Sequence, residues 1–239
     1  MTSALVGLGR EFRSIDYVHG EAEVEHAMLA NPTTPGSRML CPSQDVRGWI
    51  KNPALIDAIT PNLRALTGLI DACPEPVSVL DVGCHGGFVY DWLKANCQSR
   101  FTYTGCDIVE SVIDAAIDAH DDGETAFDVA DVTSLDRHYK ARSYDIVFCS
   151  RVLIHLPYFR ANMARLYTVA KRSLLVVLKL GERDVVKIMV ADETTIYSRQ
   201  FSRDTVADVA GKLTKSWRVE GKGTGFQSLI LEKGRRSKR

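Results

Sequence analysis

The stretch Val77–Phe88, VSVLDVGCHGGF, joins a buried type of strand, a glycine-rich turn and the start of a helix. Its first six residues are mainly apolar and rich in valine, which is typical of a strand inside a sheet. Gly83, Gly86 and Gly87 come next. Glycine lets backbone amides approach a ligand because it tolerates positive φ and has no side chain. Taken alone, this pattern also fits an ordinary tight turn between a strand and a helix.

The chain after this turn alternates between apolar runs and helical patterns. Strands are predicted at residues 101–107, 125–131, 144–150 and 173–180, and helices at 90–97, 110–120, 158–171 and 203–213. Two further strands, at 217–223 and 226–234, are close enough to form a hairpin. The predicted fold is α/β, a doubly wound seven-stranded sheet that is parallel with a final antiparallel hairpin, with helices on both faces.

The first fifty residues differ from the rest because Pro, Gly and Ser interrupt them. We predict an irregular, partly helical N-terminal extension over 1–50, with a helix at 20–30, a main domain over 51–233 and a basic tail over 234–239. The main domain is expected to open with a helix from Asn52, an N-cap residue, that is split or kinked at Pro61.

Composition excludes several classes of protein. The 30 Lys and Arg residues balance the 30 Asp and Glu residues, which disfavours a protein that grips long nucleic acids. The six cysteines form no CxxC pair, so reduced thiols are expected and no metal site. The chain has neither a signal peptide pattern nor an apolar run of about 20 residues that would span a membrane. We expect a cytoplasmic protein.

Acidic residues end successive predicted strands. Asp81 lies in the first strand, Asp107 ends the second and Asp131 ends the third. The carboxyl edge of an open α/β sheet is where ligands bind, and an acid about 20 residues after the glycine turn commonly holds a ribose hydroxyl. A carboxylate there can also accept a hydrogen bond from an exocyclic amine such as that of adenine. Jointly these acids predict a nucleoside site.

Residues 77–233 resemble the class I S-adenosylmethionine-dependent methyltransferase family. Asp81, Gly83 and Gly87 match its first motif, with His85 in place of the middle glycine, and YDIVFCSRVLIHL (144–156) matches its fourth. The resemblance implies that S-adenosylmethionine is the cofactor, with its methionine part over the glycine turn, its ribose at Asp107 and its adenine at Asp131. The implied cofactor-binding residues are Asp81, Gly83, Cys84, His85, Gly87, Asp107, Ile108, Asp131, Val132 and Ser150.

The same resemblance suggests residues for the methyl acceptor. His155 is the candidate general base, because an oxygen acceptor with a high pKa needs one; the alternative is a hydrogen-bonded residue that supports the pocket wall. The extension is expected to cap the site, and residues 193–202 to lie beside the acceptor. The candidate acceptor-binding residues are Tyr17, His19, Arg151, Tyr197 and Arg199.

The residues just after the fourth strand disfavour several acceptors. Ser150-Arg151 replaces both the Asp/Asn-Pro-Pro-Tyr/Phe motif of DNA amino-methyltransferases and the aspartate of the Lys-Asp-Lys-Glu RNA enzymes, although Lys179 matches one lysine of the latter. The predicted function is methyl transfer to an oxygen or nitrogen of a small molecule or glycan. The alternatives are a non-catalytic binding partner, which His85 would signal, and an RNA or protein methyltransferase.

Overall fold

The computed structural model describes residues 14–30, 53–74, 76–120, 123–191, 194–223 and 225–234. The breaker-rich part of the N-terminal extension, the predicted N-cap Asn52, Cys41 and the last five residues of the basic tail lie outside the described residues. Five cysteines are described and all are free thiols.

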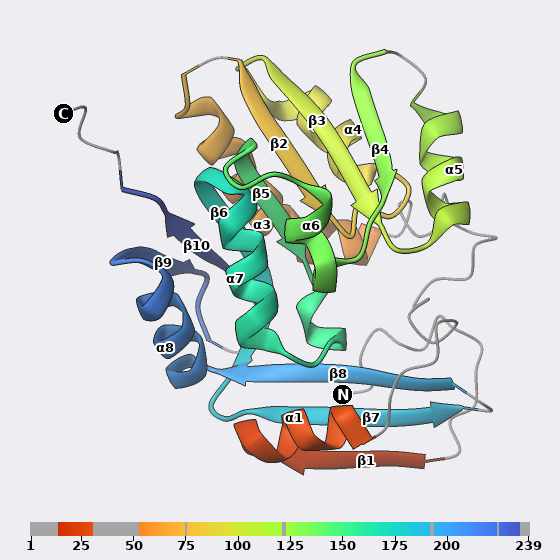
Figure 1. Cartoon of the computed structure of the whole chain (residues 1–239), viewed down its shortest axis with the longest axis vertical. Helices are drawn as coiled ribbons and strands as arrows, with labels where there is room; N and C mark the ends of the chain where they lie inside the picture. The colour runs from red at the N-terminus through yellow and green to blue at the C-terminus, as the bar shows by residue number, and fades with distance from the viewer. Residues whose placement is uncertain are drawn as a thin grey trace.

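A mainly parallel sheet forms the centre of the molecule (Figure 1). Its strands are β2 (Val77–Val82), β3 (Phe101–Asp107), β4 (Thr125–Val129), β5 (Tyr144–Ser150), β6 (Ala170–Gly181), β9 (Ser216–Glu220) and β10 (Gly225–Glu232). The parallel strands run in the order β4-β3-β2-β5-β6, and β10 pairs antiparallel with β6 and β9. The seven predicted strands and the final hairpin are confirmed. Because the chain order reverses between β2 and β5, the ligand site of such a sheet is expected at their carboxyl ends.

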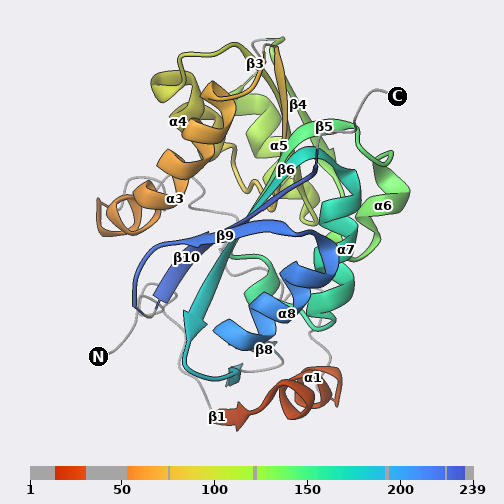
Figure 2. The ribbon, with the colours of Figure 1, turned by 90° about the vertical axis from the view of Figure 1, so that its left-hand side faces the viewer.

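Helices cover both faces of this sheet (Figure 2). They are α3 (Pro53–Asp71), α4 (Phe88–Asn96), α5 (Glu110–Ala119), α6 (Leu135–His138), α7 (Phe159–Val169) and α8 (Arg203–Leu213). One buried cluster joins α3 and α4 to the sheet, and a second joins α6, α7 and α8 to its other face. Along β6, Leu174, Val176 and Leu178 belong to the second cluster, whereas Leu175 and Val177 belong to the first. Apolar residues at consecutive positions are therefore needed, because both faces of this strand are buried.

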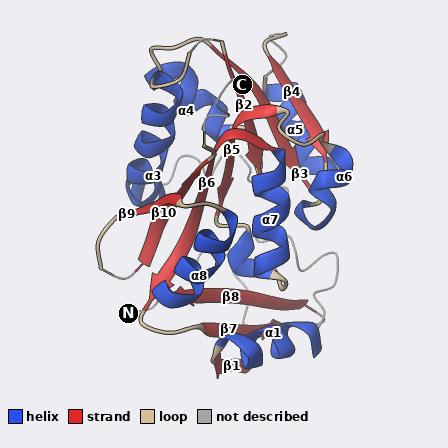
Figure 3. Cartoon of the chain, turned by 60° about the vertical axis from the view of Figure 1, so that its left-hand side comes forward, coloured by secondary structure: helices blue, strands red, loops and turns tan. Residues whose placement is uncertain are grey.

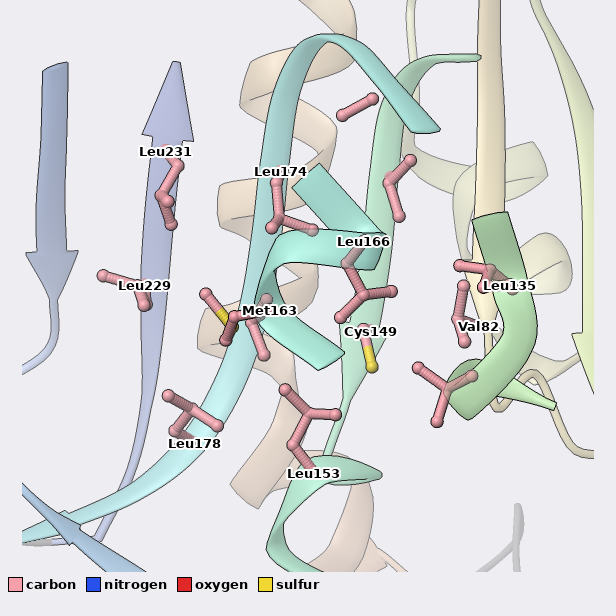
Figure 4. Close-up of a cluster of buried hydrophobic side chains, with 14 of the residues drawn as sticks. Val82, Leu135, Cys149, Leu153, Met163, Leu166, Leu174, Leu178, Leu229 and Leu231 are labelled. Carbon is pink, nitrogen blue, oxygen red and sulfur yellow. The ribbon is translucent and has the colours of Figure 1, made fainter. Parts of the chain in front are cut away.

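Figure 4 shows the cluster beneath α7, in which Met163 and Leu166 meet side chains of several strands. Leu153 lies in the same cluster, in the short 3-10 turn η4 (Leu153–His155) that comes after β5. The turn that carries the candidate base is thus anchored in the core by its own first residue.

The predicted helix at Pro53 is present, but Pro61 does not split it. Helix α3 is continuous from Pro53 to Asp71 with Pro61 inside it. Pro61 itself is exposed. Water can therefore satisfy the carbonyl that proline leaves without a backbone donor.

A second, antiparallel layer crosses the carboxyl ends of the parallel strands, as Figures 1 and 3 show. It consists of β1 (Ser14–His19), β7 (Val185–Ala191) and β8 (Thr194–Ser202), in the order β1-β7-β8. Strand β8 pairs with β6 only at Leu180–Phe201 and Gly181–Ser202. Through these two residue pairs the three antiparallel strands continue the central sheet, which then has ten strands. These three strands were not predicted.

Helix α1 (Glu21–Ala30) lies on this second layer, at the position where the sequence predicts a helix. Val24 and Met28 are buried against Val186, Ile188 and Tyr197. The described part of the N-terminal extension therefore packs on the fold through a small core of its own.

Candidate functional site

The glycine-rich turn after β2 is held in a tight conformation that needs glycine at two positions. Gly83 has φ 80° and Gly87 has φ 84°, both in the left-handed region. A Cβ at Gly83 would collide with the Val152 side chain, and one at Gly87 would lie 2.5 Å from Nε2 of His120. The backbone N–H groups of Gly83 and Cys84 both donate to the Cys106 carbonyl, at 2.7 and 3.0 Å.

His85, which replaces the family's middle glycine, adopts the glycine-like conformation. Its φ is 51°, and its backbone N–H donates to Oδ2 of Asp107 at 3.2 Å. Burial lowers the pKa of its imidazole, and the Asp107 carboxylate opposes that shift. With histidine in place of glycine at position 85, the backbone of the turn still hydrogen-bonds the Asp107 carboxylate at the end of β3.

Asp107 stands at the end of β3 with acceptor capacity to spare. Its two oxygens accept from the backbone N–H groups of His85 and Val109, each at 3.2 Å. A carboxylate has about four lone-pair sites, so two ribose hydroxyls still find acceptors. Ile108 beside it is 37% exposed, an apolar surface suited to the face of a base.

Asp131 and Val132 lie where β4 leads into the 3-10 turn η3 (Val132–Ser134). Oδ1 of Asp131 accepts from the Thr133 N–H at 2.8 Å and so caps that turn. The Val132 side chain is buried in the core. Asp131 therefore stabilises the start of η3, in addition to the adenine contact that the sequence predicts for it.

Asp81 and Cys84 lie beneath the turn. Asp81 is 1% exposed and accepts from the Tyr103 hydroxyl at 2.7 Å. Burial raises the pKa of Asp81 to about 7; the bond from Tyr103 opposes the rise and the Asp107 carboxylate adds to it. The buried Cys84 thiol donates to the His85 carbonyl at 3.4 Å. Both side chains support the turn from below.

The start of α4 adds donors to the same place. Gly87 is its N-cap residue and provides no side-chain cap. The first N–H groups of a helix favour a negatively charged partner such as a carboxylate.

Ser150, Arg151 and His155 lie in succession at and beyond the end of β5. Ser150 is its last residue, Arg151 has φ 63°, and His155 ends η4. Nδ1 of His155 lies 2.5 Å from the Tyr197 carbonyl oxygen on β8. Burial lowers the pKa of His155 to about 4, and the bond to that carbonyl opposes the shift. The structure therefore brings η4 and β8 together at the carboxyl edge.

The side chains of Tyr197 and Arg199 are buried within the fold. Tyr197 is 1% exposed and its hydroxyl donates to the Met28 carbonyl at 3.3 Å. Arg199 is 0% exposed, donates to Glu25 of α1, and lies 3.8 Å from Asp184. The side chains of Tyr197 and Arg199 therefore bind α1 to β8. The contact with His155 is made by the backbone carbonyl of Tyr197.

Tyr17 and His19 lie on β1, two strands away from β8. Tyr17 is 60% exposed and pairs across the sheet with Lys187; His19 pairs with Val185. Among the described residues, no hydrogen bond or ion pair joins either side chain to the residues after β5.

Two site residues were missed by the sequence reasoning. Nε2 of His120, at the end of α5, donates to the Gly86 carbonyl at 3.2 Å. Glu25 caps α7 through the Tyr158 N–H at 2.6 Å while it pairs with Arg199. Neither residue sits in a motif, and both act across long sequence separations, so the sequence carried no signal for them.

Comparison with known proteins agrees with this geometry. The methyltransferase domain family matches residues 80–173. A S-adenosylmethionine-dependent methyltransferase from Aquifex aeolicus superposes with a TM-score of 0.57 at 16% identity, covering 80% of this chain and 98% of that one. The magnesium protoporphyrin IX methyltransferase of Synechocystis PCC 6803, solved with S-adenosylhomocysteine, gives 0.56 at 18%, covering 77% and 88%. The 1,6-didemethyltoxoflavin-N1-methyltransferase of Burkholderia thailandensis gives 0.56 at 16%, covering 78% and 81%. No curated protein matches the chain.

The fold is that of the Rossmann-like, class I S-adenosylmethionine-dependent methyltransferases, and residues 80–173 match a methyltransferase domain family. These findings support S-adenosylmethionine as the cofactor and methyl transfer as the activity. No helix among the described residues is long and apolar enough to cross a membrane. Within the same part of the chain, no three His, Cys, Asp or Glu residues gather as a metal-binding group.

The residues present fit this cofactor. The uncapped start of α4 suits its carboxylate, the spare acceptors of Asp107 suit the ribose, and Ile108 suits the adenine face. When bound, the cofactor supplies a methyl group on a positively charged sulfur, which leaves as a neutral thioether. The protein's remaining tasks are to orient the acceptor and to take up its proton.

Proposed function

We propose that the protein methylates an oxygen or nitrogen atom of a small molecule or glycan, with His155 as the general base. The observation that carries this proposal is the bond between Nδ1 of His155 and the Tyr197 carbonyl. A carbonyl oxygen only accepts, so Nδ1 must carry the hydrogen. The neutral ring then has its lone pair on Nε2.

The protonation state of His155 suits a base. Its pKa of about 4 keeps the imidazole neutral at pH 7. In the proposed step, Nε2 accepts the proton that the acceptor atom loses as it becomes methylated. The bond to Tyr197 then stabilises the imidazolium, because a charged donor makes the stronger hydrogen bond.

The acceptor class is supported by what the site contains and by two neighbours. The Mg-protoporphyrin and didemethyltoxoflavin enzymes are named for small molecules. The 30 Lys and Arg residues are balanced by 30 Asp and Glu residues, whereas proteins that bind long nucleic acids usually carry a basic excess. An RNA or protein acceptor and a non-catalytic partner remain as the alternatives that the experiment addresses.

The test is transfer of radiolabel from S-adenosylmethionine to metabolite and glycan fractions of the protein's own cell. We expect His155→Ala to lower turnover by about 10²–10⁴ while S-adenosylhomocysteine affinity stays unchanged. His138→Ala is the matched control, because His138 is exposed on α6. Label found only in RNA or protein, or in no fraction, would contradict the proposed acceptor class.

The pH profile separates a base from a supporting residue. A base with a pKa of about 4 should leave turnover flat from about pH 6 upward and lower it as pH falls through about 4. If His155 only supports the wall, His155→Ala should lower the free energy of unfolding and keep turnover per folded molecule.

Binding of the cofactor is tested at Asp107. Asp107→Ala should weaken S-adenosylhomocysteine binding by about 1–3 kcal/mol, since buried ribose hydroxyls lose their acceptor. Asp118→Ala, at an exposed position on α5, is the control. Equal affinity of the two variants in isothermal titration would remove Asp107 from the cofactor site.

A further inference from the structure

Arg151 is a partly buried cation at the carboxyl edge of the sheet that has no acidic partner among the described residues. Its guanidinium lies over the Phe226 ring, 4.1 Å from the ring centroid, and Nη2 reaches the Ala58 carbonyl only at 3.5 Å. Its Nε is buried with no hydrogen-bond partner in the described structure. Buried polar groups are nearly always hydrogen-bonded, so an open donor beside a reactive centre calls for an explanation.

Arg151 differs from two other buried charged residues in that it lacks an ion-pair partner in the described part of the chain. The buried carboxylate of Asp145 pairs with Lys171 and Arg172, and the buried Arg199 pairs with Glu25. Within the described ranges, no carboxylate forms an ion pair with Arg151. Desolvation lowers the pKa of Arg151 to about 10, which reflects burial without a counter-charge.

A second cation lies on the same face. Lys179 of β6 pairs directly with Phe226 of β10 in the antiparallel register. Directly opposed residues on antiparallel strands project to the same side of the sheet. Phe226 already contacts Arg151, so Phe226 links the two cations. Lys179 also forms no ion pair with any residue that the structure describes.

The two cations adjoin the place of methyl transfer. Arg151 comes directly after Ser150, and its backbone N–H donates to the Val177 carbonyl at 3.1 Å. Val152, the next residue, touches the position of a Gly83 Cβ in the cofactor turn. Arg151 is therefore one residue away from contact with the turn.

We propose that the methyl acceptor carries an anionic group, a carboxylate or a phosphate, which Arg151 and Lys179 bind. This inference rests on the proposed function and names its substrate class. Stacking on Phe226 restrains the guanidinium, and its planar fork matches the two oxygens of such a group. Lys179 adds a point charge from the neighbouring strand.

The test is titration of benzoate and of inorganic phosphate into the protein saturated with S-adenosylhomocysteine. We expect at least one of the two anions to bind, and its identity to distinguish a carboxylate from a phosphate acceptor. Benzamide, the neutral analogue of benzoate, should not bind. Arg151→Gln and Lys179→Met should each weaken anion binding about tenfold or more, the loss of one charge-assisted bond. Lys215→Met is the control, because Lys215 is exposed on the loop before β9.

A second variant distinguishes a specific loss of anion binding from misfolding. Arg151→Lys keeps the charge and loses the planar fork, so it should bind the anion with intermediate affinity. S-adenosylhomocysteine affinity should remain within about threefold of wild type in all these variants.

Three results would overturn the inference. These are failure of both anions to bind, undiminished binding to Arg151→Gln, and loss of S-adenosylhomocysteine affinity in Arg151→Gln, which would assign the guanidinium to the cofactor's own carboxylate. The proposed function is tested separately by radiolabel transfer and by His155→Ala. A protein that transfers label yet ignores both anions would overturn this inference alone.

Discussion

Gly87→Ala is the substitution whose effect the structure specifies most closely. The new Cβ would lie 2.5 Å from Nε2 and 2.6 Å from Cδ2 of His120, and 3.2 Å from Cζ of Phe127. His120 cannot yield easily: its ring stacks on Phe127 at 5.6 Å, meets Tyr90 edge-on at 5.4 Å and donates to the Gly86 carbonyl. The residue at position 87 must also keep φ near 84°.

The magnitude has two parts. A non-glycine residue in the left-handed region costs about 1–2 kcal/mol. Overpacking against a fixed ring adds about 1–3 kcal/mol. Gly123→Ala isolates the first part, because Gly123 has φ 73° and no described atom lies within 4 Å of its added Cβ. We therefore expect a loss of about 1–2 kcal/mol for Gly123→Ala and about 2–5 kcal/mol for Gly87→Ala.

The assay is urea unfolding combined with isothermal titration of S-adenosylhomocysteine. In the double variant Gly87→Ala, His120→Ala the clash disappears, so it should be more stable than the sum of the single effects by about 1–3 kcal/mol. Gly87→Ala should also weaken cofactor binding, whereas Gly123→Ala should not. Equal losses for Gly87→Ala and Gly123→Ala, or strict additivity in the double variant, would refute the view that His120 fixes the turn.

Three further substitutions test the turn, the buried ion pair and the pH dependence of stability. Gly83→Val should weaken S-adenosylhomocysteine binding at least about tenfold in isothermal titration, because a branched side chain must displace Val152 and strain the turn. Glu25→Gln should lower the free energy of unfolding by about 2–4 kcal/mol, since buried Arg199 loses its hydrogen-bonded charged partner and keeps only Asp184 at 3.8 Å, whereas exposed Glu23→Gln should not change it. For Asp145, burial raises the pKa, but bonds from Arg172, Ser78 and Lys171 outweigh it and hold the pKa at about 2. Because the folded pKa is the lower one, Asp145 contributes about 2 kcal/mol above about pH 4, lost as pH falls toward 2, and Asp145→Asn should remove this step from the urea-unfolding profile.

The parallel sheet could be predicted, and residues of the cofactor site could be proposed, because their signals are local. Each strand from β2 to β6 has its own apolar run, and Asp107 directly ends its strand. The glycine turn lies within one short segment. The sequence shows glycine at both positions, 83 and 87, where the structure has positive φ. Such features need no knowledge of distant contacts.

The second layer could not be predicted, because its strands depend on each other. Strand β1 pairs with β7, which lies about 170 residues further along the chain. The segment that becomes β8 was expected beside the acceptor, but nothing local distinguishes it as a strand that joins β6 through only two residue pairs. Arg199 was predicted to bind the acceptor because residues 193–202 resemble the stretch beside the acceptor in related enzymes. Its ion-pair partner Glu25 lies 174 positions away, so no local pattern indicated the pair.

These long-range contacts converge on the candidate base. The Tyr197 carbonyl sets the tautomer of His155, and Arg199 lies two residues further along the same strand. Arg199 is fixed by Glu25, which also caps α7 just beyond η4. The orientation of the imidazole therefore depends on α1 as well as on the strand that touches it. The proposed cofactor residues lie mostly in the turns that follow consecutive strands, whereas the proposed acceptor residues come from segments far apart in the chain.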